Sequence, residues 1–355
     1  MKRKIIWLIL SALIILSSCK FFLGPEPDTG PSEVLRSLWD DINNIHANLD
    51  FRMSANLNYN NWYDVYNNKQ TGYAQKIKSG MSEKSLFKVC ADILEELNDP
   101  HVSLFSSDYG YRYIKGANEY FTLDKARSYL RGKGNTVNKN FVFGTFSSDS
   151  DIGYIYISEF LYENTESEVQ ESTSAIDSII NALEKTKALV LDIRNNRGGD
   201  IYLMEYIAAR FASESKDYCK LIIKKGPGPN DFSAPIIYTI RSIKKASGNK
   251  YGYTKPIVLL TNKNTVSMAE WFTMALRTQS HVTHIGTATC GAFSPRKERF
   301  MINGWVYSIS PGRVTDMDGK NYEGQGISPD KEIANTENQT DKQLEGAVKF
   351  AASAK

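Results

Sequence analysis

Apolar residues follow a helical period in the first third of this chain. Between residues 32 and 97 they recur at spacings of three and four, which places them on one face of an α-helix. The two clearest runs are Val34, Leu35, Leu38, Ile42 and Ile45, and then Leu86, Val89, Cys90, Ile93, Leu94 and Leu97. Ser82, just before the second run, is a residue type that caps helix N-termini. The pattern predicts a small N-terminal helical bundle.

After residue 109 the pattern becomes strand-like, and from residue 152 onward apolar strands alternate with helical stretches. The expected strands are 152–157, 188–193 and 257–260, and the expected helices are 169–183, 201–211 and 268–276. Alternation of this kind predicts an α/β core with largely parallel strands. We therefore divide the chain into a leader (1–18), a flexible tether (19–31), a helical bundle (32–105), a short β-rich connector (106–148), an α/β core (149–335) and a C-terminal helix or tail (336–355).

The leader has the pattern of an export signal rather than of a folded element. Three basic residues precede an apolar run over residues 5–16, which as a helix would span about 18 Å against roughly 30 Å for a bilayer core. The run ends in Leu16-Ser17-Ser18-Cys19, which resembles the lipobox of bacterial lipoproteins. That resemblance implies lipidation of Cys19 and an anchor in the bacterial cell envelope, in the outer membrane facing the periplasm or at the cell surface. The alternative is an ordinary signal peptide in which Cys19 occurs by chance.

Composition excludes some classes of function. Hydrophobic residues make up 41% and charged residues 23% of the 355 residues, values typical of a globular protein rather than a disordered one. The net charge is +3, and because three of the 43 basic residues lie in the leader, the remainder is balanced by the 40 acidic residues. A balanced chain gives no reason to expect a nucleic-acid partner, since phosphate binding needs a surplus of clustered basic residues.

Neither the cysteines nor the histidines predict a metal or another cofactor. Outside the leader the cysteines are Cys90, Cys219 and Cys290. Their spacing is not that of metal ligands, and the sequence does not select a disulfide pair among them. His281 and His284 lie three residues apart, but no carboxylate cluster accompanies them, so we expect two exposed loop histidines.

The candidate chemistry lies at two turns in which a buried strand leads into a helix. The first turn is Asp192-Ile-Arg194-Asn-Asn196-Arg-Gly198-Gly199-Asp200. Its glycines can aim free backbone N–H groups at an anion beside a helix N-terminus. The second turn places Ser267 at the start of a helix, where its hydroxyl is positioned as a nucleophile and the N–H of Met268 as an oxyanion donor. Taken singly, each feature is more often a structural helix cap.

Together the two turns resemble the tail-specific, or C-terminal processing, serine peptidases, the family that includes the tricorn core protease. The first turn is similar to the family's Asp-x-Arg-x-Asn-x-Gly-Gly motif, and Ser267-Met-Ala-Glu270 is similar to its Ser-x-Ala-Glu motif. Three further blocks match in order: Asn98-Asp99-Pro100-His101, Ile285-Gly286-Thr-Ala-Thr289-Cys-Gly291 and Glu323-Gly-Gln-Gly326-Ile-Ser-Pro329-Asp330. The resemblance covers roughly residues 32 to 335, and it implies a crotonase-like (ClpP-like) β-β-α spiral core.

One position distinguishes two branches of this family. Peptidases with a Ser-Lys dyad carry the lysine in a Thr-x-Gly-Lys-Gly stretch, but here Ala292 stands at that place and Lys297 follows five residues later. The resemblance therefore points to the histidine-using branch, in which a histidine is the general base and a glutamate orients it. The implied catalytic triad is Ser267, His101 and Glu323.

The same resemblance implies an oxyanion hole. The backbone N–H of Met268 and that of Gly198 or Gly199 would bind the oxyanion, and the choice between the two glycines is left open. Asp192 and Arg194 are expected to stabilise the fold near the site. Many larger relatives carry a PDZ domain between bundle and core, but the connector is too short to hold one, so specificity for C-termini is left open.

These observations predict a membrane-tethered serine endopeptidase that hydrolyses exported or envelope polypeptides through a Ser-His-Glu triad, without a cofactor or metal. The expected partners are polypeptide substrates and a membrane held through the lipid at Cys19. The alternative, from another class, is a catalytically silent peptide- or ligand-binding lipoprotein on the same scaffold. A silent scaffold would be expected to lack a triad residue, and none is missing. The substrate and the oligomeric state are left open.

Overall fold

The computed structural model describes residues 29–54, 56, 58–113, 119–161, 166–243, 252–337 and 340–354. The predicted leader, most of the tether and the lipobox with Cys19 lie outside the described residues. Within the described part, none of the helices combines the length and the apolar character needed to cross a bilayer.

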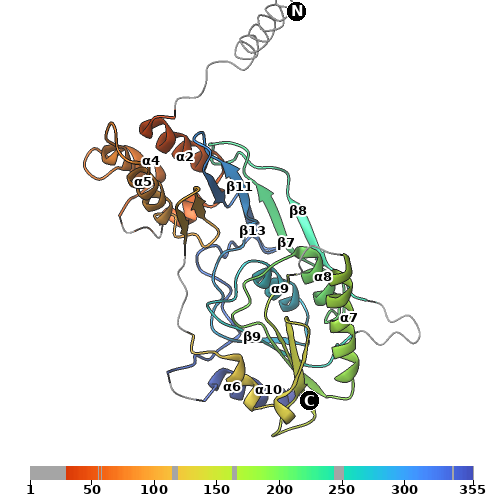
Figure 1. Ribbon diagram of the computed structural model, residues 1–355. Coiled ribbons are helices and arrows are strands. Elements are labelled where there is room, and N and C mark those ends of the chain that lie inside the picture. Colours follow the sequence, from red (N-terminus) through yellow and green to blue (C-terminus); the bar gives the residue numbers. More distant parts are fainter. Residues whose placement is uncertain are drawn as a thin grey trace, which may run out of the picture.

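The N-terminal region is a small helical bundle, as its period predicted (Figure 1). Its helices are α2 (Pro31–Ile45), α3 (Leu49–Ser54), α4 (Trp62–Asn67) and α5 (Glu83–Glu95), with a 3₁₀ turn at Tyr73–Lys76. The apolar faces of α2 and α5 are buried together in one hydrophobic cluster. The Ser82 side chain accepts a hydrogen bond from the Ser85 N–H and caps α5, which confirms the predicted helix start.

A seven-stranded sheet forms the centre of the core, in the order β14-β10-β9-β6-β5-β4-β3. Its strands are β3 (Asn135–Val137), β4 (Phe141–Thr145), β5 (Ile152–Ile157), β6 (Ala188–Asp192), β9 (Ile257–Thr261), β10 (Val282–Gly286) and β14 (Lys331–Glu332). Strands β5, β6, β9, β10 and β14 run parallel to one another, and β4 and β3 are antiparallel. Because Asp192 pairs with Leu260, β6 and β9 end at the same edge of the sheet, and the turns that follow them emerge side by side.

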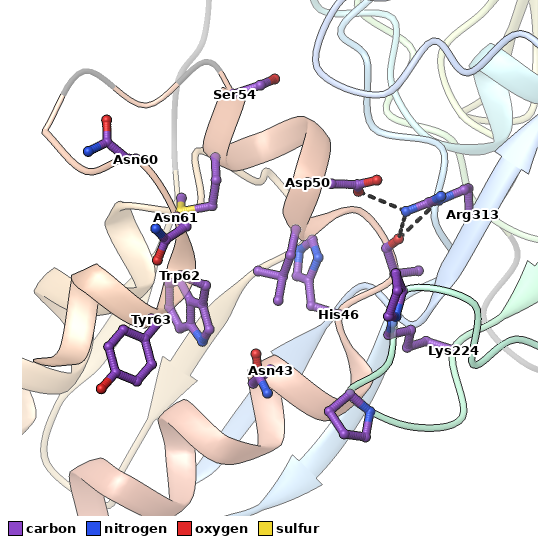
Figure 2. Close-up of a pocket in the computed structure, with 15 residues that line it drawn as sticks. Asn43, His46, Asp50, Ser54, Asn60, Asn61, Trp62, Tyr63, Lys224 and Arg313 are labelled. Carbon is purple, nitrogen blue, oxygen red and sulfur yellow. Dashed lines mark hydrogen bonds and ion pairs between the residues drawn. The ribbon is translucent and has the colours of Figure 1, made fainter.

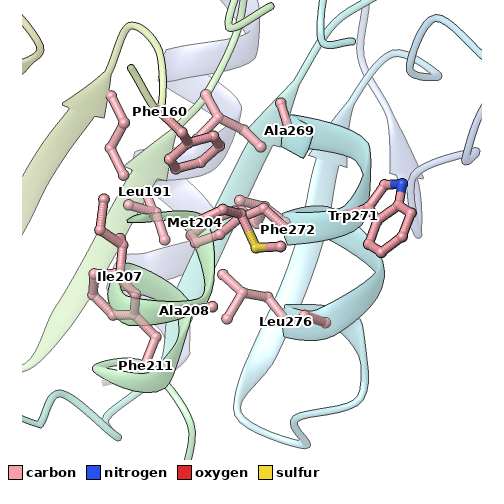
Figure 3. Packing of buried hydrophobic residues seen from close by; sticks show 14 of the residues in the cluster. Phe160, Leu191, Met204, Ile207, Ala208, Phe211, Ala269, Trp271, Phe272 and Leu276 are labelled. Carbon is pink, nitrogen blue, oxygen red and sulfur yellow. The ribbon is translucent and has the colours of Figure 1, made fainter. Parts of the chain in front are cut away.

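Helices cover both faces of this sheet. On one face, α7 (Glu166–Ala182), α8 (Ile201–Ala209) and α9 (Met268–Arg277) share a hydrophobic cluster with the strands. Figure 3 shows Met204 and Ile207 of α8 packed against Phe272 and Leu276 of α9. On the other face, α6 (Leu123–Ser128) and α10 (Lys342–Ala354) contribute to a second cluster. Each large apolar side chain buried in this way contributes about 1.5–3 kcal/mol to stability, so both helix layers hold the sheet in place.

Two smaller sheets connect the bundle to the core. One has the order β11-β12-β1-β2 and the other β13-β7-β8. Their strands are β1 (Ser103–Phe105), β2 (Gly110–Arg112), β7 (Lys216–Ile223), β8 (Ile236–Ile240), β11 (Lys297–Phe300), β12 (Val306–Ile309) and β13 (Gly312–Thr315). Because β1 pairs with β12, the segment that carries His101 is joined to a strand from the last quarter of the chain. The expected connector over 106–148 contains β2, α6, β3 and β4, and the last two extend the core sheet.

Candidate active site

Ser267 occupies a strained corner between β9 and α9. Its backbone angles are φ 62° and ψ −125°, a region that residues with a side chain rarely adopt. Such a conformation costs about 1–3 kcal/mol and persists where the surroundings enforce it. The Ser267 N–H donates to Oε2 of Glu270 at 3.1 Å, which holds the corner. This is the strand-turn-helix placement expected of a serine nucleophile.

Glu270 is a buried residue that ties the Ser267 corner to a second loop, residues 289–293. Its Oε1 accepts hydrogen bonds from the Thr289 hydroxyl at 2.7 Å and from the Gly291 N–H at 2.6 Å. Its Oε2 accepts the Ala292 N–H at 2.8 Å in addition to that of Ser267. Burial raises the pKa of Glu270, and these hydrogen bonds act in the opposite direction. Ala292 therefore contributes to the site through its backbone N–H, which donates to Glu270.

The two glycines of the first turn are both required by close packing. A Cβ added to Gly198 would lie 2.8 Å from Cβ of Ser267 and 2.7 Å from N of Met268. A Cβ on Gly199 would lie 2.3 Å from the carbonyl oxygen of Phe160. Both glycines also have positive φ, +92° and +138°. Glycine is therefore needed twice here, once to admit Ser267 and once to admit the chain at Phe160.

The hydrogen bonds of this turn distinguish the two glycines. The Gly198 N–H donates to the Oδ1 of Asn196 at 2.8 Å and is therefore occupied. The Asn196 carbonyl accepts the Val266 N–H at 2.9 Å, which fixes the turn against the Ser267 corner. Among the described residues, no acceptor takes the backbone N–H of Gly199 or of Met268. Of the two glycines, Gly199 is therefore the one whose N–H is not already occupied.

His101 lies on the bundle side, just before β1. Its backbone N–H donates to Oδ1 of Asp99 at 2.9 Å, and its carbonyl accepts the Ser308 hydroxyl at 2.6 Å. The Nδ1 atom is buried without a hydrogen-bond partner. Burial lowers the pKa of His101, partly opposed by the charge of Asp99, so the ring is neutral at pH 7. Within the described part of the chain, no hydrogen bond joins His101 to Ser267 or to Glu323.

Glu323 is buried on the far side of the 289–293 loop. Its Oε2 accepts the Phe293 N–H at 3.1 Å, and its Oε1 accepts a short hydrogen bond from Nη2 of Arg52. Burial raises the pKa of Glu323 to about 7, although the charge of Arg52 acts to lower it. The structure therefore brings Glu323 to an arginine of the bundle and to the same loop that Glu270 holds from the Ser267 side.

Three residues of this cluster are not predicted by the sequence reasoning above, namely Arg52, His46 and the carboxylate of Asp99 as a charged partner. His46 Nε2 lies 3.0 Å from Oδ2 of Asp99, and both side chains are fully buried. Burial alone would raise the pKa of Asp99, but Arg52 and His46 outweigh it and hold that pKa well below its usual range. The Asp-x-His block contained a signal for Asp99, whereas nothing in the local pattern marks Arg52.

A cavity of about 520 Å³ lies behind this cluster, between the bundle and the segment after β7 (Figure 2). Its walls include Asn43, His46, Trp62, Lys224 and Arg313. Ser267, His101 and Glu323 do not line it. His46 lines the cavity and its Nε2 lies 3.0 Å from Oδ2 of Asp99, so the cavity adjoins the charged cluster rather than the nucleophile.

The structure separates the remaining candidates from the Ser267 corner or buries them. Lys297 begins β11 and is exposed, and Cys290 is a free thiol whose pKa burial raises to about 12. The expectation of two exposed loop histidines is wrong for His284. This residue is fully buried in β10, with Nε2 2.6 Å from the Thr261 hydroxyl and Nδ1 2.8 Å from Arg277. In the described part of the chain, no group of three or more His, Cys, Asp or Glu side chains could hold a metal.

Comparison with known proteins identifies the family of this chain. The model for peptidase family S41 matches residues 151–333, which are more than half of this chain. The chain belongs to peptidase family S41. The predicted family is thereby confirmed.

The curated relatives match this chain over only part of their own length. The carboxy-terminal processing protease CtpA of Bacillus subtilis (strain 168) is 29% identical over 183 residues, which cover 51% of this chain and 34% of that protein. The nisin-resistance protein of Lactococcus lactis subsp. lactis is 23% identical, over 45% of this chain and 51% of that protein. The chain thus spans between about a third and a half of the curated relatives it matches.

Solved structures show the same fold over nearly the whole chain. A crystal structure from Parabacteroides merdae has a TM-score of 0.77 at 24% identity and covers 91% of this chain and 97% of its own. The photosystem II D1 C-terminal processing protease has a TM-score of 0.52 at 18% identity, over 91% of this chain and 98% of its own. The predicted α/β fold with a small N-terminal helical region is confirmed.

Proposed function

We propose that this chain is a serine peptidase that hydrolyses polypeptides with Ser267 as its nucleophile. The observation that carries the proposal is the strained Ser267 corner, packed against Gly198 and flanked by the unengaged N–H groups of Gly199 and Met268. A hydroxyl and nearby backbone N–H groups without an internal acceptor are the parts that acyl transfer requires. Family membership supports the same reaction class.

In the proposed reaction, the Ser267 Oγ attacks the carbonyl carbon of the scissile bond while neutral His101 takes the hydroxyl proton. The oxyanion is held by the N–H groups of Gly199 and Met268. The buried carboxylates of Asp99 and Glu323 compensate the imidazolium, which then gives its proton to the leaving amine. Water hydrolyses the acyl-enzyme by the same steps in reverse order. Catalytic hydrogen bonds are often long without substrate and tighten in the Michaelis complex, so contact between His101 and Ser267 is expected there.

A catalytically silent binding lipoprotein is the second candidate. It is favoured by one observation, that Glu323 is engaged by Arg52 rather than by His101. A fluorophosphonate reagent separates the two candidates, because covalent labelling needs an activated serine and does not need a known substrate. Labelling of wild-type protein supports the peptidase.

Replacing the nucleophile or the base tests the assignment of roles. Ser267→Ala should abolish labelling and lower the cleavage rate of an unfolded protein by several orders of magnitude, on the order of 10⁶ in one serine protease. His101→Ala should lose about 10⁴-fold or more, since it removes the general base. Lys297→Ala is the matched control and should keep wild-type activity. An inactive Lys297→Ala together with an active His101→Ala would contradict the triad.

We further propose that a lipid on Cys19 tethers the peptidase to a membrane of the bacterial envelope, where exported polypeptides would be its substrates. Two or three acyl chains give stable anchoring, because each buried CH₂ contributes about 0.8 kcal/mol. Mass spectrometry of the mature N-terminal peptide should find a diacylglyceryl thioether on Cys19, and a Cys19→Ser variant should leave the membrane fraction. An unmodified Cys19 would mean an ordinary signal peptide.

A further inference from the structure

Arg52 carries a buried positive charge from the helical bundle to the catalytic half of the molecule. It lies on α3 and is 4% exposed. Its Nη1 donates to the carbonyl of Asn98 at 2.7 Å, and its Nη2 donates to that of Gly291 at 3.2 Å and to Oε1 of Glu323. Nη2 also lies 3.6 Å from Oδ1 of Asp99. A buried guanidinium costs several kcal/mol unless such partners compensate it, so this placement needs both carboxylates.

These contacts connect the two halves of the proposed site. On one side Arg52 holds the carbonyl of Asn98 and the carboxylate of Asp99, which accepts the backbone N–H of His101. On the other side it holds Glu323 and the carbonyl of Gly291, whose N–H is bound by Glu270 beneath Ser267. The Arg52 guanidinium therefore contacts both the segment that precedes His101, the proposed base, and Glu323, the proposed carboxylate partner.

We propose that Arg52 is a positioning residue of the active site, which orients Glu323 and fixes the segment that carries His101. The inference deepens the proposed peptidase function and rests on it. Like His101, Arg52 lies outside the segment 151–333 that the family model matches, so both residues would contribute to the site from the N-terminal part of the chain.

Several charged groups surround Glu323 and His101 and influence the pKa of each. The groups that face Glu323 are Arg52, Asp99, Glu270 and the Phe293 N–H, and those that face His101 are Asp99, Arg52, Arg296 and His46. Cys290 and Tyr113 also lie within the field of Arg52. Among the described residues, no arginine or lysine other than Arg52 forms an ion pair with Asp99 or with Glu323.

Both titrations respond to Arg52 in the same direction. Burial dominates at each group, but the charge of Arg52 lowers the pKa of Glu323 and the pKa of His101. Removing that charge therefore raises both. Because the reaction needs neutral His101 and ionised Glu323, the acid limb of the pH profile must move to higher pH when Arg52 loses its charge.

The experiment measures the pH dependence of the fluorophosphonate labelling rate and of kcat/KM for wild type, Arg52→Gln and Arg52→Lys. For Arg52→Gln we expect at least a tenfold loss at pH 7, mostly in kcat, and an acid limb about one pH unit higher or more, with partial recovery above pH 8. Arg52→Lys, which keeps the charge but not the fork of donors, should lose activity with a smaller shift.

Arg299→Gln is the matched control. Arg299 also links the bundle to another sheet, with Nε 3.0 Å from Oδ2 of Asp41, but it is one-third exposed and does not contact Glu323. It should keep the wild-type pH profile. An Arg52→Gln profile with the wild-type midpoint would overturn the inference, whatever its thermal stability. If that variant does not fold, an unshifted and fully active Arg52→Lys overturns it equally. A wild type that is not labelled at any pH would instead refute the serine peptidase itself, and the inference with it.

Discussion

Arg194 and Arg52 are both buried and each lies against two carboxylates, but their surroundings differ. Arg194 donates from Nε and Nη2 to Asp192 and from Nη1 to Asp341 and Gln343, so all three of its nitrogens have acceptors. Arg52 also has two carboxylate partners, but its Nε is buried without an acceptor, and so is Nδ1 of the nearby His101.

We interpret the Arg194 network as one that stabilises the fold and the Arg52 network as one that serves the proposed reaction. In the Arg194 network every guanidinium nitrogen donates to an acceptor, although Oδ2 of Asp341 is buried without a partner, and a network with its donors occupied contributes to the stability and specificity of the fold. A set with unmet hydrogen bonds is less stable than it could be, and such groups concentrate at functional sites. Arg194 and Arg52 should therefore fail in different ways when they are replaced.

The largest expected difference is in stability. Arg194→Gln leaves Asp192 and Asp341 buried without their counter-charge, and breaking a buried pair in this way costs about 3–5 kcal/mol. Urea unfolding should show that loss, while any folded fraction keeps the wild-type acid limb of activity. A loss below about 1 kcal/mol, or a shifted acid limb, would remove the contrast with Arg52.

A smaller effect is expected in the pH dependence of stability at Glu323. Its folded pKa of about 7 lies above the unfolded value of about 4.3, so the protonated form stabilises the fold below pH 4 and this contribution is lost as pH rises through 7. Asp99 behaves in the opposite way, since its low folded pKa gives stability above pH 4 that is lost on acidification. The Glu323→Gln variant should therefore gain up to about 3 kcal/mol relative to wild type between pH 4 and pH 8. A constant difference across that range would contradict the assignment.

The sequence was sufficient for the elements that depend on local patterns. The strand predicted over 152–157 coincides with β5, because a parallel strand covered on both faces has a continuous apolar run. Ser267 and the two glycines were recognisable because a strand-turn-helix corner has a local signature. The sequence could not show whether Gly198 or Gly199 offers its N–H to the oxyanion, because that depends on the Asn196 side chain, which accepts the Gly198 N–H.

The local hydrophobic pattern could not predict contacts between residues that are far apart in the sequence. Arg52 and Glu323 are separated by 271 positions, and an arginine on a short helix looks like an ordinary surface residue. His284 was expected on the surface because its neighbours suggested a turn, but β10 lies inside the core sheet and buries it. Burial of a polar side chain depends on which element covers it, and that element can lie anywhere in the chain.

The pairing of Arg194 with Asp341 has a consequence for the order in which the protein matures. The two residues are 147 positions apart, so a chain synthesised from its N-terminus presents Ser267, His101 and Glu323 before Asp341 exists. Until α10 docks, the end of β6 holds a cation with one of its two carboxylates missing, directly before the turn that carries Gly198 and Gly199. The segment that carries Asp341 thus completes the charge network at this edge of the sheet only after Ser267, His101 and Glu323 have all been synthesised.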